Sequence, residues 1–166
     1  MGLVNGKVYF DNNYSLYKEM YNKEKKILSN IFSNAIIEHV GSTAVKDLLA
    51  KPIVDIAIGL NKLDITNVLD KLNDYIIKYH DDEILLIKEF NNETNYLVHI
   101  LDINSDRYKN MIKFRDLLIN NNHIRKEYEK LKIDLQNKYS NDRVTYTKLK
   151  GKYIKEIIDE NNNIWR

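Results

Sequence analysis

The sequence predicts an α+β (α/β) fold, in which a mixed β-sheet of four to five strands packs against helices and the C-terminal part, about 105–160, is helical. Two apolar, β-branched runs flank a glycine turn between residues 36 and 60. Two further apolar runs, 83–90 and 95–102, are separated by a short polar stretch that is typical of a hairpin. Beyond residue 105, apolar side chains recur at helical spacing. The length of 166 residues suits one domain, 1–166.

The composition narrows the class of protein. A hydrophobic fraction of 43% is enough to build a core, and no apolar run is long enough to cross a membrane. The first residues lack the apolar segment of a secretory signal, and the chain has no cysteine for disulfides or thiol chemistry. The net charge of +2 is small for a nucleic-acid-binding domain, so we do not expect a nucleic acid as partner. Because there is no long apolar run, we do not expect a membrane as partner either. A cytoplasmic location is the simplest expectation.

The first expected element is an amphipathic helix. Asp11-Asn12-Asn13 offers an N-cap, and the helix is expected to run to about Phe32. Its helically spaced residues are Tyr17, Met20, Glu24, Ile27, Leu28 and Ile31.

The stretch that organises the chain reads as strand, turn, connector and strand. Ile36–Val40 is apolar and β-branched, and Gly41 ends it because glycine bends most freely. The connector Ala44–Ala50 has room for one or two helical turns before Pro52 halts it. The second strand is expected over Ile53–Leu60.

Asp55 is the one charge inside this second strand. Period-2 alternation sets two faces, Ile53, Asp55 and Ala57 on one and Val54, Ile56 and Ile58 on the other. A buried carboxylate is costly without a partner. The turn at Gly41 and Ser42 offers N–H groups to phosphate oxygens, and Asp55 can hold a divalent cation. The alternative is a plain turn followed by an aspartate that caps or pairs locally.

The middle of the chain is expected to hold one helix and one hairpin. Asp64 caps a helix to about Tyr79, whose inner residues are Ile65, Val68, Leu69, Leu72 and Ile76. The strands Glu83–Phe90 and Asn95–Asp102 then form the hairpin. His99 lies in the second of these strands, and Glu89 is a further carboxylate in the first.

Three helices are expected to follow. The first starts at Ser105 or Asp106 and ends near Asn120, and the second runs from about His123 to Tyr139. The last begins at the Ser140-Asn141-Asp142 cap, and Gly151 within it costs about 1 kcal/mol relative to alanine unless close packing needs it.

Several blocks in this order resemble the GrpB family, which is similar to the nucleotidyltransferase superfamily. The blocks are His39–Val45 (HVGSTAV), Lys51–Ile56 (KPIVDI), Phe114–Leu118 (FRDLL), Tyr128–Lys132 (YEKLK) and Tyr146–Lys150 (YTKLK). The match extends over nearly the whole chain. It implies a nucleotidyltransferase-like sheet, with the last three helices forming one side of a cleft.

The chain departs from the family and superfamily patterns at three places. Ala57 stands where the superfamily has its second metal-binding carboxylate, which puts a two-metal site in doubt. Lys46-Asp47 replaces a Pro-Gly pair, and Leu97 replaces the first histidine of a His-x-His strand whose second histidine is His99. Glu89 is a candidate for the missing acid, although nothing in the sequence selects it.

The resemblance also implies roles for individual residues. Gly41, Ser42 and Thr43 would hold the β- and γ-phosphates of a nucleoside triphosphate, and Asp55 would bind Mg²⁺ or Mn²⁺. Lys51 or Arg115 would stabilise the developing charge, and His99 would position the attacking group or act as base. The expected basic wall comprises Arg115, Lys132 and Lys150, and for Arg115 the alternative is an ion pair with Asp116.

The leading hypothesis for function is a metal-dependent nucleotidyltransferase that moves a nucleoside monophosphate from an NTP to an unknown small-molecule or protein acceptor. The alternative is a non-catalytic module that binds a nucleotide or a CoA-related metabolite, since the family resembles a domain fused to dephospho-CoA kinase. A role in drug resistance or a toxin–antitoxin pair is a third, weaker hypothesis. In each case, Asp55 is expected near Ser42, with His39, Lys51, His99 or Arg115 offsetting its charge.

Overall fold

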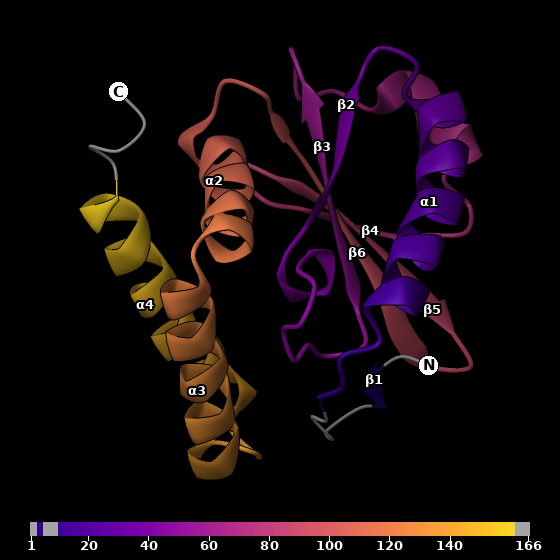
Figure 1. Ribbon diagram of the computed structural model, residues 1–166. Coiled ribbons are helices and arrows are strands. Elements are labelled where there is room, and N and C mark those ends of the chain that lie inside the picture. Colours follow the sequence, from indigo (N-terminus) through magenta and orange to yellow (C-terminus); the bar gives the residue numbers. More distant parts are fainter. Residues whose placement is uncertain (1–2, 5–9, 162–166) are drawn as a thin grey trace.

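The centre of the molecule is a mixed β-sheet, seen edge-on between two helical layers in Figure 1. The computed structural model describes residues 3–4 and 10–161. The strands, in their order across the sheet, are β2 (Ile36–Val40), β3 (Val54–Leu60), β6 (Glu93–Asp102), β5 (Ile84–Phe90) and β4 (Ile76–Tyr79). Strands β3 and β6 run parallel and the other neighbours antiparallel. A short strand, β1 (Leu3–Val4), also pairs with β6.

Helices cover both faces of this sheet. Helix α1 (Tyr14–Ile31) lies on one face, while α2 (Asp106–Asn120), α3 (Asn122–Lys138) and α4 (Arg143–Glu160) gather on the other (Figure 1). The architecture confirms the predicted mixed sheet with packed helices and a helical C-terminal part. No helix in the described residues is long and apolar enough to cross a membrane.

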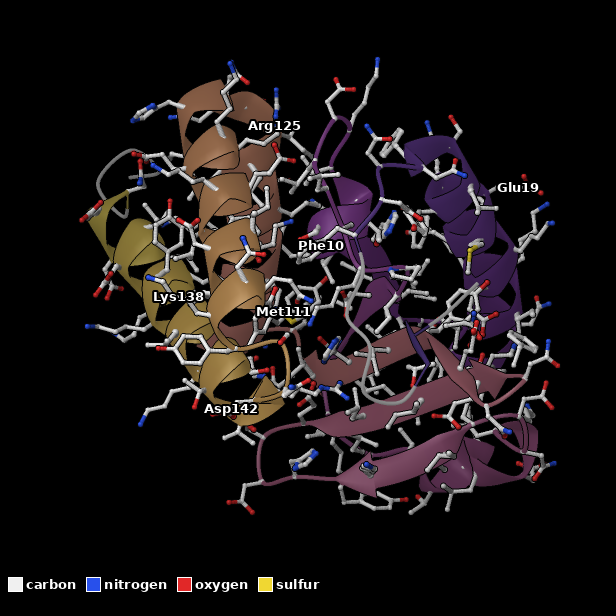
Figure 2. All side chains as sticks on the ribbon, turned by 90° about the horizontal axis from the view of Figure 1, so that it is seen from below. Phe10, Glu19, Met111, Arg125, Lys138 and Asp142 are labelled. Atoms are coloured by element: carbon white, nitrogen blue, oxygen red, sulfur yellow. The ribbon has the colours of Figure 1, made fainter. Side chains whose placement is uncertain are left out.

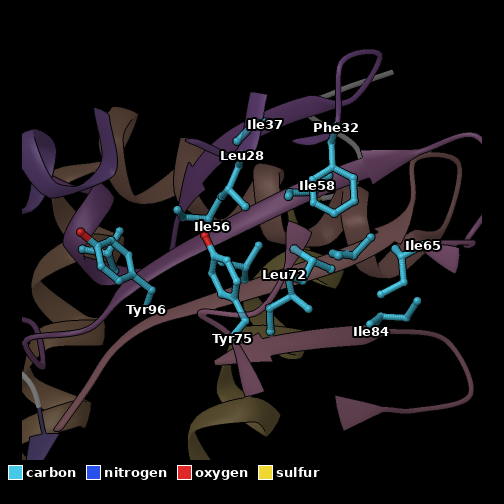
Figure 3. Packing of buried hydrophobic residues seen from close by; sticks show 14 of the residues in the cluster. Leu28, Phe32, Ile37, Ile56, Ile58, Ile65, Leu72, Tyr75, Ile84 and Tyr96 are labelled. Carbon is cyan, nitrogen blue, oxygen red and sulfur yellow. The ribbon is translucent and has the colours of Figure 1, made fainter. Parts of the chain in front are cut away.

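The face toward α1 holds the larger hydrophobic core (Figure 3). Val54, Ile56 and Ile58 of β3 pack there against Leu28 and Phe32 of α1, as the period-2 alternation predicts. One buried ion pair lies under the same helix, where Lys88 Nζ stands 3.0 Å from Glu24 Oε1. Tyr75 also donates to Glu24, so the buried carboxylate is fully engaged and has no need of a ligand.

The opposite face of the sheet is smaller and more polar. Ala57 packs there with Val40, Leu101 and Tyr108, and Asp55 lies on the same face. Helices α2–α4 build a cluster of their own, which includes Val45 and Leu48 from the connector after β2. The helices are therefore held against the end of the sheet that carries Asp55.

The predicted helix caps are confirmed. Asn13 accepts a hydrogen bond from the Leu16 N–H, and Ser105 accepts one from the Tyr108 N–H. Asp142, from the predicted cap stretch, likewise begins α4, and α3 begins at Asn121, for which no cap was predicted; each accepts from backbone N–H groups of the first turn. The Ser140-Asn141-Asp142 stretch therefore separates α3 from α4, as expected.

The helix predicted from Asp64 to Tyr79 is wrong. Asp64 does cap a turn, because its Oδ1 accepts from the Thr66 N–H at 3.0 Å, but only a short 3₁₀ helix, η2 (Thr66–Lys71), follows. The chain then turns at residues 73–74 and continues as β4, which pairs with β5 from Ile76 opposite Ile87. The segment forms a strand because it pairs with β5 and contains β-branched residues, and these two effects outweigh the helical spacing of its apolar residues.

The connector after β2 also differs in detail from its prediction. Its helical part is one 3₁₀ turn, η1 (Ser42–Ala44), which starts two residues earlier than expected, and Val45 is already extended. The predicted hairpin is confirmed, with Asn91 and Asn92 at φ 54° and 60° between β5 and β6. Two residues with positive φ are what a tight two-residue hairpin requires, and asparagine tolerates this conformation.

Candidate functional site

A cavity of about 730 Å³ lies between the sheet and helices α2–α4. In Figure 2, Phe10 and Met111, both of which line it, lie between these helices and the sheet. The cavity brings together eight residues predicted as site residues from the sequence: Gly41, Ser42, Thr43, Lys51, Asp55, His99, Lys132 and Lys150. They come from the β2–β3 connection, β3, β6, α3 and α4, so the helices form one side of the cleft as predicted.

The glycine turn positions Ser42 beside Asp55. Gly41 has φ +71°, a conformation that favours glycine, and a Cβ at this position would overlap the Asp55 side chain. Val40 pairs with Asp55 across β2 and β3, so the turn follows at the same level as the carboxylate. Ser42 and Thr43 are thereby held at the end of β2, next to the acid.

Lys132 closes the site from the side of α3. Its side chain is 3% exposed, and Nζ lies 3.2 Å from Ser42 Oγ while also donating to the Leu49 carbonyl. The ammonium group also stands 4.9 Å from the centre of the Tyr128 ring. A cation from α3 and a hydroxyl from the turn after β2 therefore meet at one point of the cavity.

Further cations surround this point. Lys51, Lys150 and Arg143 line the same cavity, and Lys51 Nζ lies 4.0 Å from the centre of the Tyr146 ring. Burial, together with the charges of Lys150 and Arg143, lowers the pKa of Lys51 to about 8. Burial and the charges of Lys150 and Lys51 lower the pKa of Lys132 to about 7. The lowered pKa values thus reflect first the burial of these two amines and second the cations placed close to them.

A chain of charged groups leads from Asp55 to the protein surface. Asp55 is 29% exposed, and its Oδ1 lies 3.6 Å from His99 Nε2. His99 Nδ1 bonds to the buried Glu83, whose other oxygen accepts from Arg107 at 2.5 Å. Burial lowers the pKa of His99, but the hydrogen bonds and charges of Asp55 and Glu83 raise it overall to about 9. Because both ring nitrogens of His99 face carboxylates, the protonated imidazolium is favoured at neutral pH, which suits a positioning role better than that of a general base.

His39 supports the turn from the other face of the sheet. Its ring stacks on Tyr21 of α1 at a centroid distance of 4.6 Å, and Nε2 lies 3.1 Å from Thr43 Oγ1. Burial lowers the pKa of His39 to about 4, so the ring is neutral. Of the four partners expected for Asp55, His99 is therefore the one that forms a charge pair with it in the described residues.

Arg115 is not among the residues that line the cavity. Its Nη1 lies 2.6 Å from Glu38 Oε2 and donates to the His39 carbonyl at 3.0 Å, and its Nε lies 2.8 Å from Asp116. The pairing with Asp116, which the sequence left open, is present and is joined by a second acid from β2. Arg115 thus fastens α2 to the sheet, and its guanidinium is already engaged by two carboxylates.

Sequence reasoning missed several lining residues. Arg143, Tyr146, Thr147 and Gly151 follow one face of α4 together with Lys150. Their spacing of three and four residues places them on the same helix face as Lys150, so the prediction of Lys150 as a site residue could have been extended to them. Glu83, the acid behind His99, had no signal in the sequence. Glu89, by contrast, lies exposed near the hairpin, where it bonds to Thr94.

The cavity supplies fewer metal-binding side chains than the resemblance implies. They do not suffice for two divalent cations. Asp55 offers a carboxylate to the cavity, but Ala57 is buried in an apolar cluster. Nowhere in residues 10–161 do three His, Asp or Glu side chains come together in a way that could hold a metal ion. A single Mg²⁺ shared between one carboxylate, phosphate oxygens and water is compatible with this arrangement.

Comparison with known proteins identifies relatives over nearly the full chain. Residues 10–160 match the family model described as GrpB protein. The chain is 31% identical to the glutamate-rich protein GrpB of Alkalihalophilus pseudofirmus, covering 96% of this chain and 99% of that protein. It is 27% identical to UPF0157 protein YqkA of Bacillus subtilis, covering 90% of this chain and 46% of that protein.

Two kinds of solved structure share the fold. The crystal structure of the conserved protein GrpB from Enterococcus faecalis superposes with a TM-score of 0.81 at 24% identity, covering 96% of this chain and 99% of that one. The Cid1 poly(U) polymerase bound to MgGTP gives a TM-score of 0.51 at 14% identity, covering 80% of this chain and 44% of that one. At these identities the likeness is one of fold.

Proposed function

Since this chain belongs to the GrpB protein family and has a nucleotidyltransferase-like fold, we propose that its cavity binds a nucleoside triphosphate. The observation that carries the proposal is the meeting of Lys132 Nζ and Ser42 Oγ, 3.2 Å apart beside a glycine turn. A hydroxyl, a buried cation and the N–H groups of a turn are the combination that phosphate oxygens favour.

The charge around this point supports a polyphosphate as the ligand. Lys51, Lys150 and Arg143 line the same cavity as Lys132, and the four side chains come from the β2–β3 connection, α3 and α4. Cations spread over a cavity wall match a chain of phosphates better than a single carboxylate ligand. The β- and γ-phosphates would lie between Ser42 and these side chains.

The remaining wall suits a nucleoside. Leu97, Met111, Phe114, Ile154 and Ile158 supply apolar surface to the same cavity. A volume of about 730 Å³ falls within the usual range for a small-molecule site. The base and ribose would pack on this surface while the phosphates occupy the cationic part.

Nucleotidyl transfer is a second candidate, and the position of Asp55 favours it. The carboxylate lies beside Gly41 at the start of β3 and faces the cavity. Asp55 would hold one Mg²⁺ or Mn²⁺ whose charge neutralises phosphate oxygens. Lys51 would stabilise charge that develops on the phosphates, and His99, already protonated, would position Asp55 through their charge pair.

Equilibrium binding tests the first candidate. Titration calorimetry with each of the four common nucleoside triphosphates and Mg²⁺ is expected to show one site per chain. Lys150→Ala is expected to weaken binding by about tenfold, because it removes one charged contact. Lys148→Ala is the matched control, since Lys148 is exposed on the same helix and does not line the cavity. Equal affinities of both variants, or no binding to the unchanged protein, would contradict the proposal.

Turnover tests the second candidate. Release of pyrophosphate, or labelling of the protein by an α-labelled NTP, is expected with Mg²⁺ or Mn²⁺ and absent in Asp55→Asn. Binding without either product identifies a non-catalytic module. Competition by dephospho-CoA, measured in the same binding assay, then tests whether a CoA-related metabolite is the ligand.

A further inference from the structure

We propose that the lysine and arginine side chains of this cavity supply enough positive charge to hold a triphosphate even when no divalent cation is bound. The inference rests on the proposed function and narrows it, because it identifies the ligand by its polyphosphate part. Its basis is the mismatch between the number of acids and the number of cations around the cavity.

The acids are too few for a two-metal site. Such sites clamp the attacking and leaving oxygens between two cations held by shared carboxylates. Asp55 is available, but Ala57 cannot bind a metal, and Glu83 is already held by His99 and Arg107. The other lining acid, Asp159, is exposed and lies 2.7 Å from Lys155.

The cations, in contrast, have no carboxylate partners among the described residues. In the part of the chain that the structure describes, no carboxylate lies within ion-pair distance of Lys51, Lys132, Lys150 or Arg143. Glu129, the acid whose charge acts on Lys132, accepts from the Leu49 N–H at 2.8 Å. Four cations without a carboxylate partner among the described residues therefore face one cavity, whose lining acids Asp55 and Asp159 already pair with His99 and Lys155.

Their mutual repulsion gives the cavity a preference for anions. The lowered pKa values of Lys51 and Lys132 mean that part of this charge is lost in the empty site near pH 8. A bound triphosphate restores favourable partners and draws protons back onto both amines. Anion binding is therefore coupled to proton uptake. A triphosphate bound only through a metal ion, without contact to these lysines, would not cause this uptake.

The test compares binding with and without divalent cations. Inorganic triphosphate and ATP are titrated into the protein in excess EDTA and, separately, in Mg²⁺. The dissociation constants in EDTA are expected to lie within about threefold of those in Mg²⁺. Lys132→Met and Lys150→Met are each expected to weaken binding in EDTA by about tenfold or more, whereas the exposed Lys148→Met is expected to leave it unchanged.

A second readout follows the protons. Calorimetry at pH 8 in two buffers that differ in their heat of ionisation is expected to show proton uptake, reduced in Lys132→Met. Binding that needs Mg²⁺, being at least about a hundredfold weaker in EDTA, would overturn this inference and leave the proposed function standing. The absence of binding under both conditions would instead reject the proposed function.

Discussion

Gly41 and Asp55 stand in direct contact: a Cβ built on Gly41 would lie 2.5 Å from Asp55 Oδ2. The glycine is needed twice, because its φ of +71° disfavours a side chain and because the carboxylate occupies the space a side chain would take. The turn that presents Ser42 and the acid that faces the cavity are thereby fitted to one another.

Gly41→Ala is expected to destabilise the protein. Backbone strain contributes about 1–2 kcal/mol and overpacking against Asp55 a similar amount. Chemical denaturation measures the loss, and Asp55→Ala provides the matched background. The cost of Gly41→Ala should fall there, because only the strain remains, and equal costs in both backgrounds would show that the carboxylate contact is unimportant.

Lys132 is expected to make stability depend on pH in the ligand-free protein. Its pKa is about 7 in the folded protein against an ordinary value of 10.5, so the unfolded chain binds more protons between these values. The contribution of Lys132 to the free energy of unfolding therefore increases as the pH rises from about 7 to 10. His99, whose pKa is raised from 6.5 to about 9, acts in the opposite direction between these two values, because there the folded protein binds more protons than the unfolded chain.

The contribution of Lys132 to this pH dependence is obtained by comparing the unchanged protein with Lys132→Met. Denaturation is measured from pH 6 to 10, the range of about four pH units over which these groups titrate, in the unchanged protein and in Lys132→Met. The stability of Lys132→Met relative to the unchanged protein should be greatest at low pH and should decline as pH rises. The exposed Lys126→Met, on the same helix, should show no such trend. A constant difference for Lys132→Met would show that its amine stays charged throughout.

Arg115→Leu is expected to lower the stability of the protein without changing its affinity for triphosphate. The guanidinium is 15% exposed and pairs with Glu38 and Asp116, both partly exposed, so its loss should cost about 1–3 kcal/mol. Thermal melting measures this loss, with the exposed Lys109→Leu on α2 as control. Triphosphate affinity should stay within about twofold, and a larger drop would mean that Arg115 reaches the ligand.

Gly151→Ala is expected to stabilise α4. No atom outside the helix backbone lies within 4 Å of a Cβ at this position, so close packing does not require the glycine, and alanine should add about 1 kcal/mol. Thermal melting checks the gain. Because Gly151 lines the cavity, Gly151→Glu should instead weaken triphosphate binding through its negative charge. Unchanged affinity in that variant would place the ligand away from this part of α4.

Much of the fold follows from local signals in the sequence. Alternation in β3 separates Asp55 from Val54 and Ile56 because side chains of a strand point to opposite faces whatever the strand pairs with. The Asn91-Asn92 turn and the Asn121 cap are likewise short-range, since each depends on the conformation of a few neighbouring residues. Strand β4 was missed because pairing with β5, a tertiary interaction, outweighed a helical apolar pattern.

The sequence by itself determined that Gly41, Ser42 and Asp55 lie together, because they fall within 15 residues and adjacent strands hold them. Only the tertiary structure decided among the cations on the helices. Lys132 reaches Ser42 across 90 residues of sequence, whereas Arg115 turns toward Glu38 and Asp116. Both have apolar neighbours within a helix, so their sequences look alike. What separates them is the rotation of each helix against the sheet, which is set by packing over the whole core.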